Sequence, residues 1–240
     1  MNILEVDHLT LRFGDLAAVK DLSFEVKRGE IFGIAGPNGA GKSTVFNIIT
    51  GFYHGTGKII FDNIDISRLS THQICYKGIA RTFQIPQLFL TLPVIDNVRV
   101  GAHFGVQGAK DEKKNMKEAI SLLGLQGREN VIAANLNLFD KKRTMLAFAM
   151  ATKPKLLLID EPIGGLSPTE TKELMALIQK VNKELGLTII IIEHLMKVLK
   201  QLSNRLMIME SGTNIIIGPP EEVVKDEKVI EIYLGRSKHA

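Results

Sequence analysis

The sequence has very little cysteine, since Cys75 is its single example. One cysteine excludes a disulfide within the chain and is typical of a reducing compartment, where such a thiol is usually inert and partly buried.

Long apolar runs are also missing: residues 189–192 fall far short of the roughly 18 residues that a membrane-spanning helix needs. The N-terminus lacks a basic segment followed by an apolar one, so we expect no signal peptide. Any membrane role therefore requires a partner.

A strong excess of one charge is missing as well. The 30 Lys and Arg residues against 26 Asp and Glu give a net charge of +4, which is too small to indicate nucleic acid by itself. With 45% apolar and 23% charged residues, the 240-residue chain has the composition of an ordinary soluble globular protein. No repeat, low-complexity segment or linker divides it into independent domains.

The strongest motif lies at residues 36–44, which fit G-x-x-x-x-G-K-[ST] at every fixed position. Apolar residues predict a buried strand at 30–35, and those of 42–50 predict a helix that stops at Gly51. This order predicts a phosphate-binding loop for a nucleotide triphosphate. The alternative, a glycine-rich turn that fits by chance, is disfavoured by the flanking strand and helix.

Each part of this loop has an expected role. Its glycines let the backbone approach the phosphates closely. Lys42 is expected to reach the β and γ phosphates, and the Ser43 hydroxyl to coordinate Mg²⁺. The expected binding residues are Gly36, Pro37, Asn38, Gly39, Ala40, Gly41, Lys42, Ser43 and Thr44.

Two later apolar segments predict strands that end in polar side chains. Residues 156–159 lead into Asp160 and Glu161, and residues 189–192 lead towards His194. In a parallel sheet such ends lie at the carboxyl edge, where ligands bind. We expect Asp160 to hold Mg²⁺ directly or through water and Glu161 to polarise an attacking water. His194 is either structural or donates a hydrogen bond to the γ phosphate.

The order of the segments predicts an α/β fold. Strands at 9–13 and 57–66 predict an antiparallel layer beside the nucleotide core. The alternation of strands and helices after residue 155 indicates a parallel sheet with crossover helices. We expect a core of residues 1–84 and 153–240, with a helical subdomain of residues 85–152 inserted into it. The expected helices are 109–125, 142–151, 169–185 and 194–202, and the expected late strands are 156–160 and 187–193.

Taken together, these motifs resemble the ATP-binding subunit of an ABC transporter. The phosphate loop, residues 81–84, Asp160 with Glu161, and His194 occur in the family's order over nearly the whole chain. The resemblance implies an ABC-type P-loop fold that binds ATP and Mg²⁺. It also implies that Gln84 ligands the metal and senses the membrane subunit. Phe13 matches the aromatic that stacks on adenine, and the alternative is a core residue of the first strand.

A finer similarity is to the branched-chain amino acid branch of this family, through residues 82–89, 160–168, 192–194 and 231–235. It implies apolar amino acids as the imported cargo, although related subunits serve urea, amides and lipopolysaccharide export. It also implies a peripheral location on the cytoplasmic face of the membrane. The implied partners are transmembrane permease subunits, docked on the helical subdomain, a second ATPase subunit and, indirectly, an extracytoplasmic solute-binding protein.

One segment departs from the family. Where the family signature reads Leu-Ser-Gly-Gly-Gln, this chain has Leu136, Asn137, Leu138, Phe139 and Asp140. Asn137 is expected to cap the following helix as serine would. We expect Phe139 to obstruct the approach of backbone N–H groups to a phosphate and Asp140 to place a negative charge near it. The alternative is a loop that packs differently.

The altered signature bears on assembly, because each site in an ABC dimer joins one subunit's phosphate loop to the other subunit's signature. A heterodimer with an intact partner is therefore favoured. A second hypothesis is a nucleotide-binding regulatory subunit with low hydrolysis. A third, a soluble ABC ATPase acting on DNA or ribosomes, is disfavoured because the chain has neither a long coiled coil nor tandem cassettes, so we expect no nucleic-acid partner.

Overall fold

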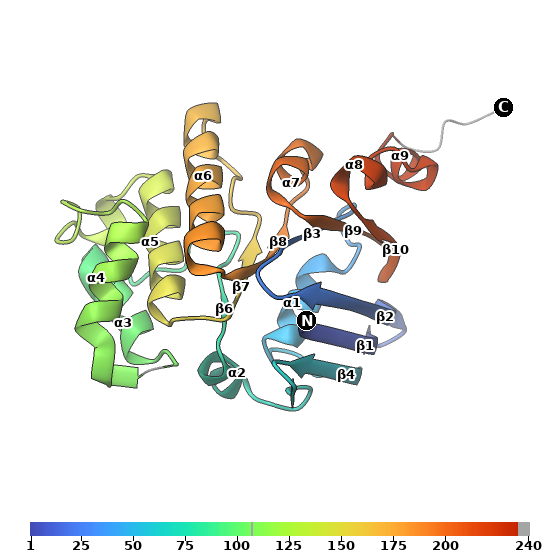
Figure 1. The fold of residues 1–240 in the computed structure, drawn as a ribbon, viewed down its shortest axis with the longest axis horizontal. Coiled ribbons are helices and arrows are strands. Elements are labelled where there is room, and N and C mark those ends of the chain that lie inside the picture. The colour runs from blue at the N-terminus through green and yellow to red at the C-terminus, as the bar shows by residue number, and fades with distance from the viewer. Residues whose placement is uncertain (107, 235–240) are drawn as a thin grey trace. The chain divides into compact units, whose positions relative to one another are not determined.

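The computed structural model describes residues 1–106 and 108–234, and it has the mixed α/β architecture expected from the sequence (Figure 1). Two compact units share the chain: residues 1–71 with those from 188 onward, and residues 72–187. The expected subdomain boundaries at 84/85 and 152/153 are not those of the compact units and stay a prediction. In the described ranges, no helix combines the length and the apolar character that a membrane crossing requires.

The first unit contains an antiparallel sheet of four strands in the order β2-β1-β4-β5 (Figure 1). Strand β1 pairs with β2 on one side and with β4 on the other. This sheet confirms the expected antiparallel layer, and the two strands predicted at 9–13 and 57–66 lie within it. The strands are β1 (Asn2–Phe13), β2 (Leu16–Lys27), β4 (Thr56–Phe61) and β5 (Ile64–Asp65).

The same unit contains a set of parallel strands. Strand β3 (Ile31–Ala35) lies between β8 (Thr188–Ile192) and β9 (Arg205–Glu210) and is parallel to both. Every residue of β3 and β8 is buried, as their mostly apolar sequences predict. Strand β10 (Thr213–Gly218) pairs antiparallel with β9. The helices of this unit are α1 (Lys42–Ile49), α7 (Met196–Leu202), α8 (Pro220–Val223) and α9 (Glu227–Leu234).

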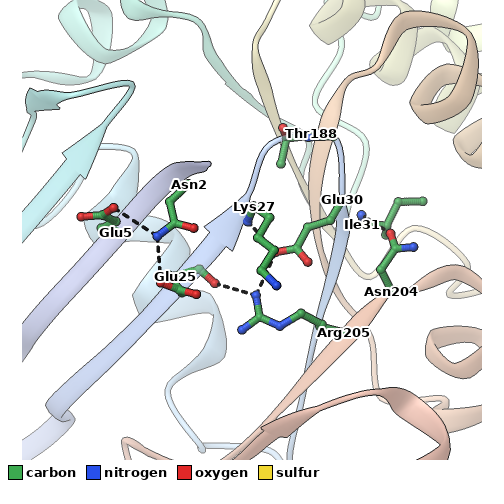
Figure 2. A network of polar contacts seen from close by, with 10 residues as sticks. Asn2, Glu5, Glu25, Lys27, Glu30, Ile31, Thr188, Asn204 and Arg205 are labelled. Atoms are coloured by element: carbon green, nitrogen blue, oxygen red, sulfur yellow. Dashed lines mark hydrogen bonds and ion pairs between the residues drawn. The ribbon is translucent and has the colours of Figure 1, made fainter.

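A polar network fixes the start of β3 (Figure 2). The buried Glu30 carboxylate accepts a hydrogen bond from the Lys27 backbone N–H at 2.6 Å and pairs with Arg205 at 3.2 Å. The Ile31 backbone N–H donates to the side chain of Asn204 at 2.8 Å. These contacts join the end of β2 and the start of β9 to β3, so the strand that leads into residues 36–44 has a defined position in this unit.

The second unit combines two short parallel strands with a group of helices. Strand β6 (Ile79–Arg81) pairs with β7 (Leu156–Asp160), and α3, α4 and α5 contact one another (Figure 1). A Cβ at Gly101 of α3 would lie 2.1 Å from the carbonyl oxygen of Phe148 in α5, so the contact requires glycine. The helices are α2 (Thr71–Lys77), α3 (Val94–His103), α4 (Glu112–Leu122), α5 (Leu138–Ala151) and α6 (Pro168–Leu185), with single 3₁₀ turns at Gly108–Asp111 and Ala133–Asn135.

Several expected boundaries are corrected by local contacts. The helix predicted at 142–151 begins four residues earlier, because Asn137 caps α5. Helix α6 begins after Ser167, which forms a reciprocal capping box with Glu170. The helix expected at 109–125 is a 3₁₀ turn followed by α4, and the helix expected from His194 begins at Met196. The elements α2, α3, α8, α9, β2, β6, β9 and β10 were not predicted.

Candidate functional site

The loop at residues 36–44 connects β3 to α1 and adopts backbone angles that require glycine. Gly36, Gly39 and Gly41 have φ values of +150°, +80° and +97°. A Cβ at Gly36 would lie 2.1 Å from the carbonyl oxygen of Met209, and one at Gly41 would lie 2.3 Å from that of Ala18. Gly36 and Gly41 are therefore fixed both by conformation and by the close approach of neighbouring backbone, and Gly39 is fixed by conformation alone.

Lys42 lies across this loop. Its side-chain nitrogen Nζ donates hydrogen bonds to the carbonyl oxygens of Gly36 at 2.8 Å and Pro37 at 3.0 Å, and the residue is 6% exposed. Helix α1 begins at Lys42, its N-cap is Gly41, and its first turn has no acidic residue. The positive end of the helix and the lysine ammonium thus belong to one loop, an arrangement that suits a phosphate group.

Phe13 is the last residue of β1 and is 47% exposed. Its ring meets that of Tyr53 edge-on, with 5.2 Å between the ring centroids. The alternative that Phe13 is a core residue of its strand is therefore wrong. Stacking on adenine stays a prediction, for which the exposed ring is available.

In the second unit, Asp160 and Glu161 follow each other at the end of β7. The Asp160 side chain is 8% exposed and pairs with Arg81, with 2.9 Å between Nη2 of the arginine and Oδ2 of the carboxylate. Glu161 has a φ of +43°, which is strained for a residue other than glycine and is found preferentially at functional sites. Gln84 donates a hydrogen bond from Nε2 to Oε2 of Glu161 at 2.6 Å. The structure therefore brings Gln84 and Glu161 together.

Two cations of this unit had no role assigned from the sequence. Arg81 is the last residue of β6 and contacts Asp160, and the nitrogen Nζ of Lys142 in α5 lies 3.5 Å from the backbone oxygen of Glu161. Lys142 is buried, with 3% of its surface exposed. Buried cations usually have charged or polar partners. The available signal was the position of Arg81, a basic residue directly after the apolar residues Ile79 and Ala80.

His194 belongs to the first unit and follows β8. Its side chain is 51% exposed, and its backbone N–H donates to the carboxylate of the fully buried Glu193 at 3.3 Å. The imidazole is thus an exposed side chain close to the end of a strand. A contact with the γ phosphate stays a prediction.

Each unit has oxygen donors of the kind that Mg²⁺ prefers. In the first unit Ser43 offers a hydroxyl, and in the second unit Asp160 offers a carboxylate and Gln84 an amide oxygen. In the ranges 1–106 and 108–234, no group of three or more His, Cys, Asp or Glu side chains is arranged to hold a metal.

The altered signature segment forms an ordered helix start. The Asn137 side chain accepts a hydrogen bond from the Asp140 backbone N–H at 2.7 Å, which confirms the expected cap. The Phe139 ring is buried, with the guanidinium of Arg143 4.6 Å from its centroid. Asp140 is 2% exposed and pairs with Arg143 and, at 3.4 Å, with Arg128.

These contacts bear on two expectations. The Phe139 ring is buried, and the Asp140 carboxylate is paired with two arginines. Obstruction of the backbone N–H groups by Phe139 and a negative charge of Asp140 near the phosphate stay predictions, as does the alternative that the loop packs differently. Of its other members, Leu136 is buried and Leu138 is 39% exposed, and Leu138 lies against Gly165.

Arg143→Ala is expected to lower the free energy of unfolding by about 2–4 kcal/mol, because it removes the nearer partner of a buried carboxylate. Arg128→Ala is the matched control: Arg128 is 51% exposed, so we expect a loss below about 1 kcal/mol. Urea unfolding followed by circular dichroism measures both. Equal losses in the two variants would contradict the assigned difference.

Comparison with known proteins identifies the family. Residues 19–164 match the family model described as ABC transporter. The chain belongs to the ABC transporter family. Residues 217–239 of this ABC protein also match a model described as branched-chain amino acid ATP-binding cassette transporter. Gly235, the last residue of the segment 231–235 that is similar to the branched-chain amino acid branch, lies outside the described residues.

Known proteins that match over nearly their whole length are also ABC transport proteins. The chain is 36% identical to the high-affinity branched-chain amino acid transport ATP-binding protein BraF of Pseudomonas aeruginosa and 38% identical to the corresponding protein LivG of Salmonella typhimurium. Each comparison covers 98% of this chain and 98% of the relative. A nucleotide-free ATP-binding cassette from an ABC transporter matches with a TM-score of 0.88 and 29% identity over 98% of this chain and 100% of that one. The ADP conformation of an ATP-binding cassette also matches with a TM-score of 0.88, over 98% of this chain and 99% of that one. The fold class is thus confirmed.

Proposed function

We propose that this chain is the ATP-hydrolysing subunit of an ABC importer for branched-chain amino acids. The observation that supports this most is the 36–38% identity to BraF and LivG over 98% of the chain, since both are named for branched-chain amino acid transport. The loop geometry around Lys42 and the Gln84–Glu161 pair supply the local chemistry. Phosphate binding and water activation are the two requirements of ATP hydrolysis.

In this proposal each unit has its own task. In the first, the loop and Lys42 bind the phosphates, Ser43 contributes a metal ligand, and Phe13 stacks on the adenine. In the second, Asp160 and Gln84 contribute the further metal ligands, and Glu161 accepts a proton from the attacking water. Gln84 orients the Glu161 carboxylate through its 2.6 Å hydrogen bond. Bound Mg²⁺ neutralises phosphate charge.

The same proposal places the chain on the cytoplasmic face of a membrane, bound to permease subunits that receive substrate from a solute-binding protein. The helical subdomain of residues 85–152 is the proposed docking region. Ile85, Phe89 and Leu90, close to Gln84 in sequence, are more than half exposed. Exposed apolar side chains of this kind are typical of a protein interface.

We further propose a heterodimer with a second ATPase subunit. The signature segment lacks both glycines of the family pattern, so its backbone N–H groups are less accessible to a phosphate even though the Phe139 and Asp140 side chains are turned inward. The loop of this chain is complete and would be matched by an intact signature of the partner. The same altered segment also motivates the alternative, a nucleotide-binding regulatory subunit with little hydrolysis of its own.

Phosphate release by the isolated chain, compared with release by the complex that copurifies with the tagged chain, tests this assembly. We expect MgATP binding in both samples and release about 10²-fold faster in the complex, because one site there gains an intact signature. Rapid, sigmoidal hydrolysis by the isolated chain would contradict the heterodimer. Binding with negligible hydrolysis in the complex would favour the regulatory subunit instead.

A further inference from the structure

The Asp160 carboxylate, a proposed metal ligand, is already in contact with a buried cation. Arg81 ends β6 and Asp160 ends the neighbouring strand β7, with which β6 pairs in parallel so that Arg81 lies opposite Leu158. The side chains meet at 2.9 Å between Nη2 and Oδ2, and each is 8% exposed. The Arg81 guanidinium also lies 5.0 Å from the centre of the Phe83 ring. Strand pairing and ring packing thus fix the arginine beside the carboxylate.

This contact has an electrostatic consequence for a divalent metal. A guanidinium stays protonated at all physiological pH values, so its charge is permanent. A second cation, Lys142, lies close by, with Nζ 3.5 Å from the backbone oxygen of Glu161. A metal ion that approaches Asp160 is repelled by these charges, and burial weakens the screening of that repulsion by water. Asp160 is therefore a poor metal ligand while it has only protein charges around it.

We propose that Arg81 is a positioning residue that keeps Asp160 paired and prevents it from binding Mg²⁺ until the metal arrives with nucleotide. The triphosphate brings several negative charges, which offset the repulsion between the metal and Arg81. The ion pair thereby makes metal binding conditional on nucleotide binding. This inference rests on the proposed role of Asp160 in the ATPase site.

Mn²⁺ binding, measured by the loss of the free-ion electron paramagnetic resonance signal, tests the inference with a readout other than activity. In Arg81→Gln the amide still donates a hydrogen bond to Asp160 but the positive charge is gone. Without nucleotide, we expect this variant to bind Mn²⁺ about tenfold more tightly than the wild type, or tighter still. Arg81→Lys, which keeps the charge, is expected to bind as weakly as the wild type. Arg81→Met is a second uncharged variant in case Arg81→Gln does not fold.

Two controls separate the possible failures. Arg99→Gln removes the arginine of an exposed pair with Asp96, 2.8 Å apart on α3, and should leave Mn²⁺ affinity unchanged. Asp160→Asn should weaken Mn²⁺ binding in the presence of ATP; if it does not, Asp160 is no ligand and both the assigned role and this inference fail. If Asp160→Asn weakens binding but the uncharged Arg81 variants bind Mn²⁺ no more tightly than the wild type, only this inference is overturned.

Discussion

Glu161→Gln is expected to slow ATP hydrolysis in the copurified complex by a factor of about 10² to 10⁴, the usual contribution of a general base. The glutamine keeps the size of the side chain, and its amide oxygen can still accept the hydrogen bond that Gln84 donates at 2.6 Å. What it loses is the ability to accept a proton from water. ATP binding should survive, so the variant should retain bound ATP.

Phosphate release measures the rate of ATP hydrolysis, and chromatography of the bound nucleotide shows whether ATP is retained. Glu173→Gln is the matched control, because Glu173 is an exposed acid on α6 of the same unit and should leave turnover unchanged. Wild-type turnover by Glu161→Gln would remove Glu161 as the base. A Glu161→Gln protein that no longer binds ATP would show that the residue acts in binding rather than in proton transfer.

Lys42→Ala is expected to weaken ATP binding by about tenfold to hundredfold, since hydrogen bonds to charged groups contribute about 1.5–3 kcal/mol. The lysine is 6% exposed and spans the loop through the carbonyl oxygens of Gly36 and Pro37, so its ammonium is already positioned before nucleotide binds. Removal therefore affects both the charge and the shape of the loop. Equilibrium binding of a fluorescent ATP analogue measures the loss.

The control for this change is Lys58→Ala, because Lys58 is an exposed cation on β4 of the same unit and should not alter affinity. Thermal unfolding of Lys42→Ala checks that the unit remains folded. Unchanged affinity in a folded Lys42→Ala protein would contradict the assignment of residues 36–44 as the phosphate-binding loop.

The nucleotide loop and the strands that end in acids were predictable because their physical causes are local. Glycine spacing, an apolar strand and a helix start lie within 20 consecutive residues, and the structure confirms β3, α1, β7 and β8 close to their expected bounds. The Asn137 cap was predictable for the same reason, since a cap and the helix N–H that donates to it are neighbours in sequence.

Helix α3 was not predicted, because its buried face contains residues that weaken the apolar pattern. Gly101 allows the close approach of α5, and Asn97 is fully buried. The Asn97 side chain accepts a hydrogen bond from the Phe89 backbone N–H at 2.8 Å and donates to the carbonyl oxygen of Leu92 at 3.2 Å. The sequence pattern predicts that such a polar residue is exposed, because the tertiary hydrogen bonds that allow its burial are not visible in the sequence.

The signature segment shows the same limit. Phe139 and Asp140 were interpreted by comparison with the residues they replace, whereas their environment depends on Arg128 and Arg143. Arg128 is 12 residues away in sequence, and its ion pair with Asp140 depends on how α5 meets the preceding loop. No local pattern predicts that contact, so the sequence alone could not tell a free charge from a compensated one.

Uptake of radiolabelled leucine by proteoliposomes that contain the copurified complex tests the central proposal most directly. With ATP on the side of this chain and the solute-binding protein with leucine on the other side, we predict leucine accumulation by the wild-type complex and none above the ATP-free background by the Glu161→Gln complex. Equal accumulation by the two complexes would contradict the proposal that ATP hydrolysis by this chain powers branched-chain amino acid import.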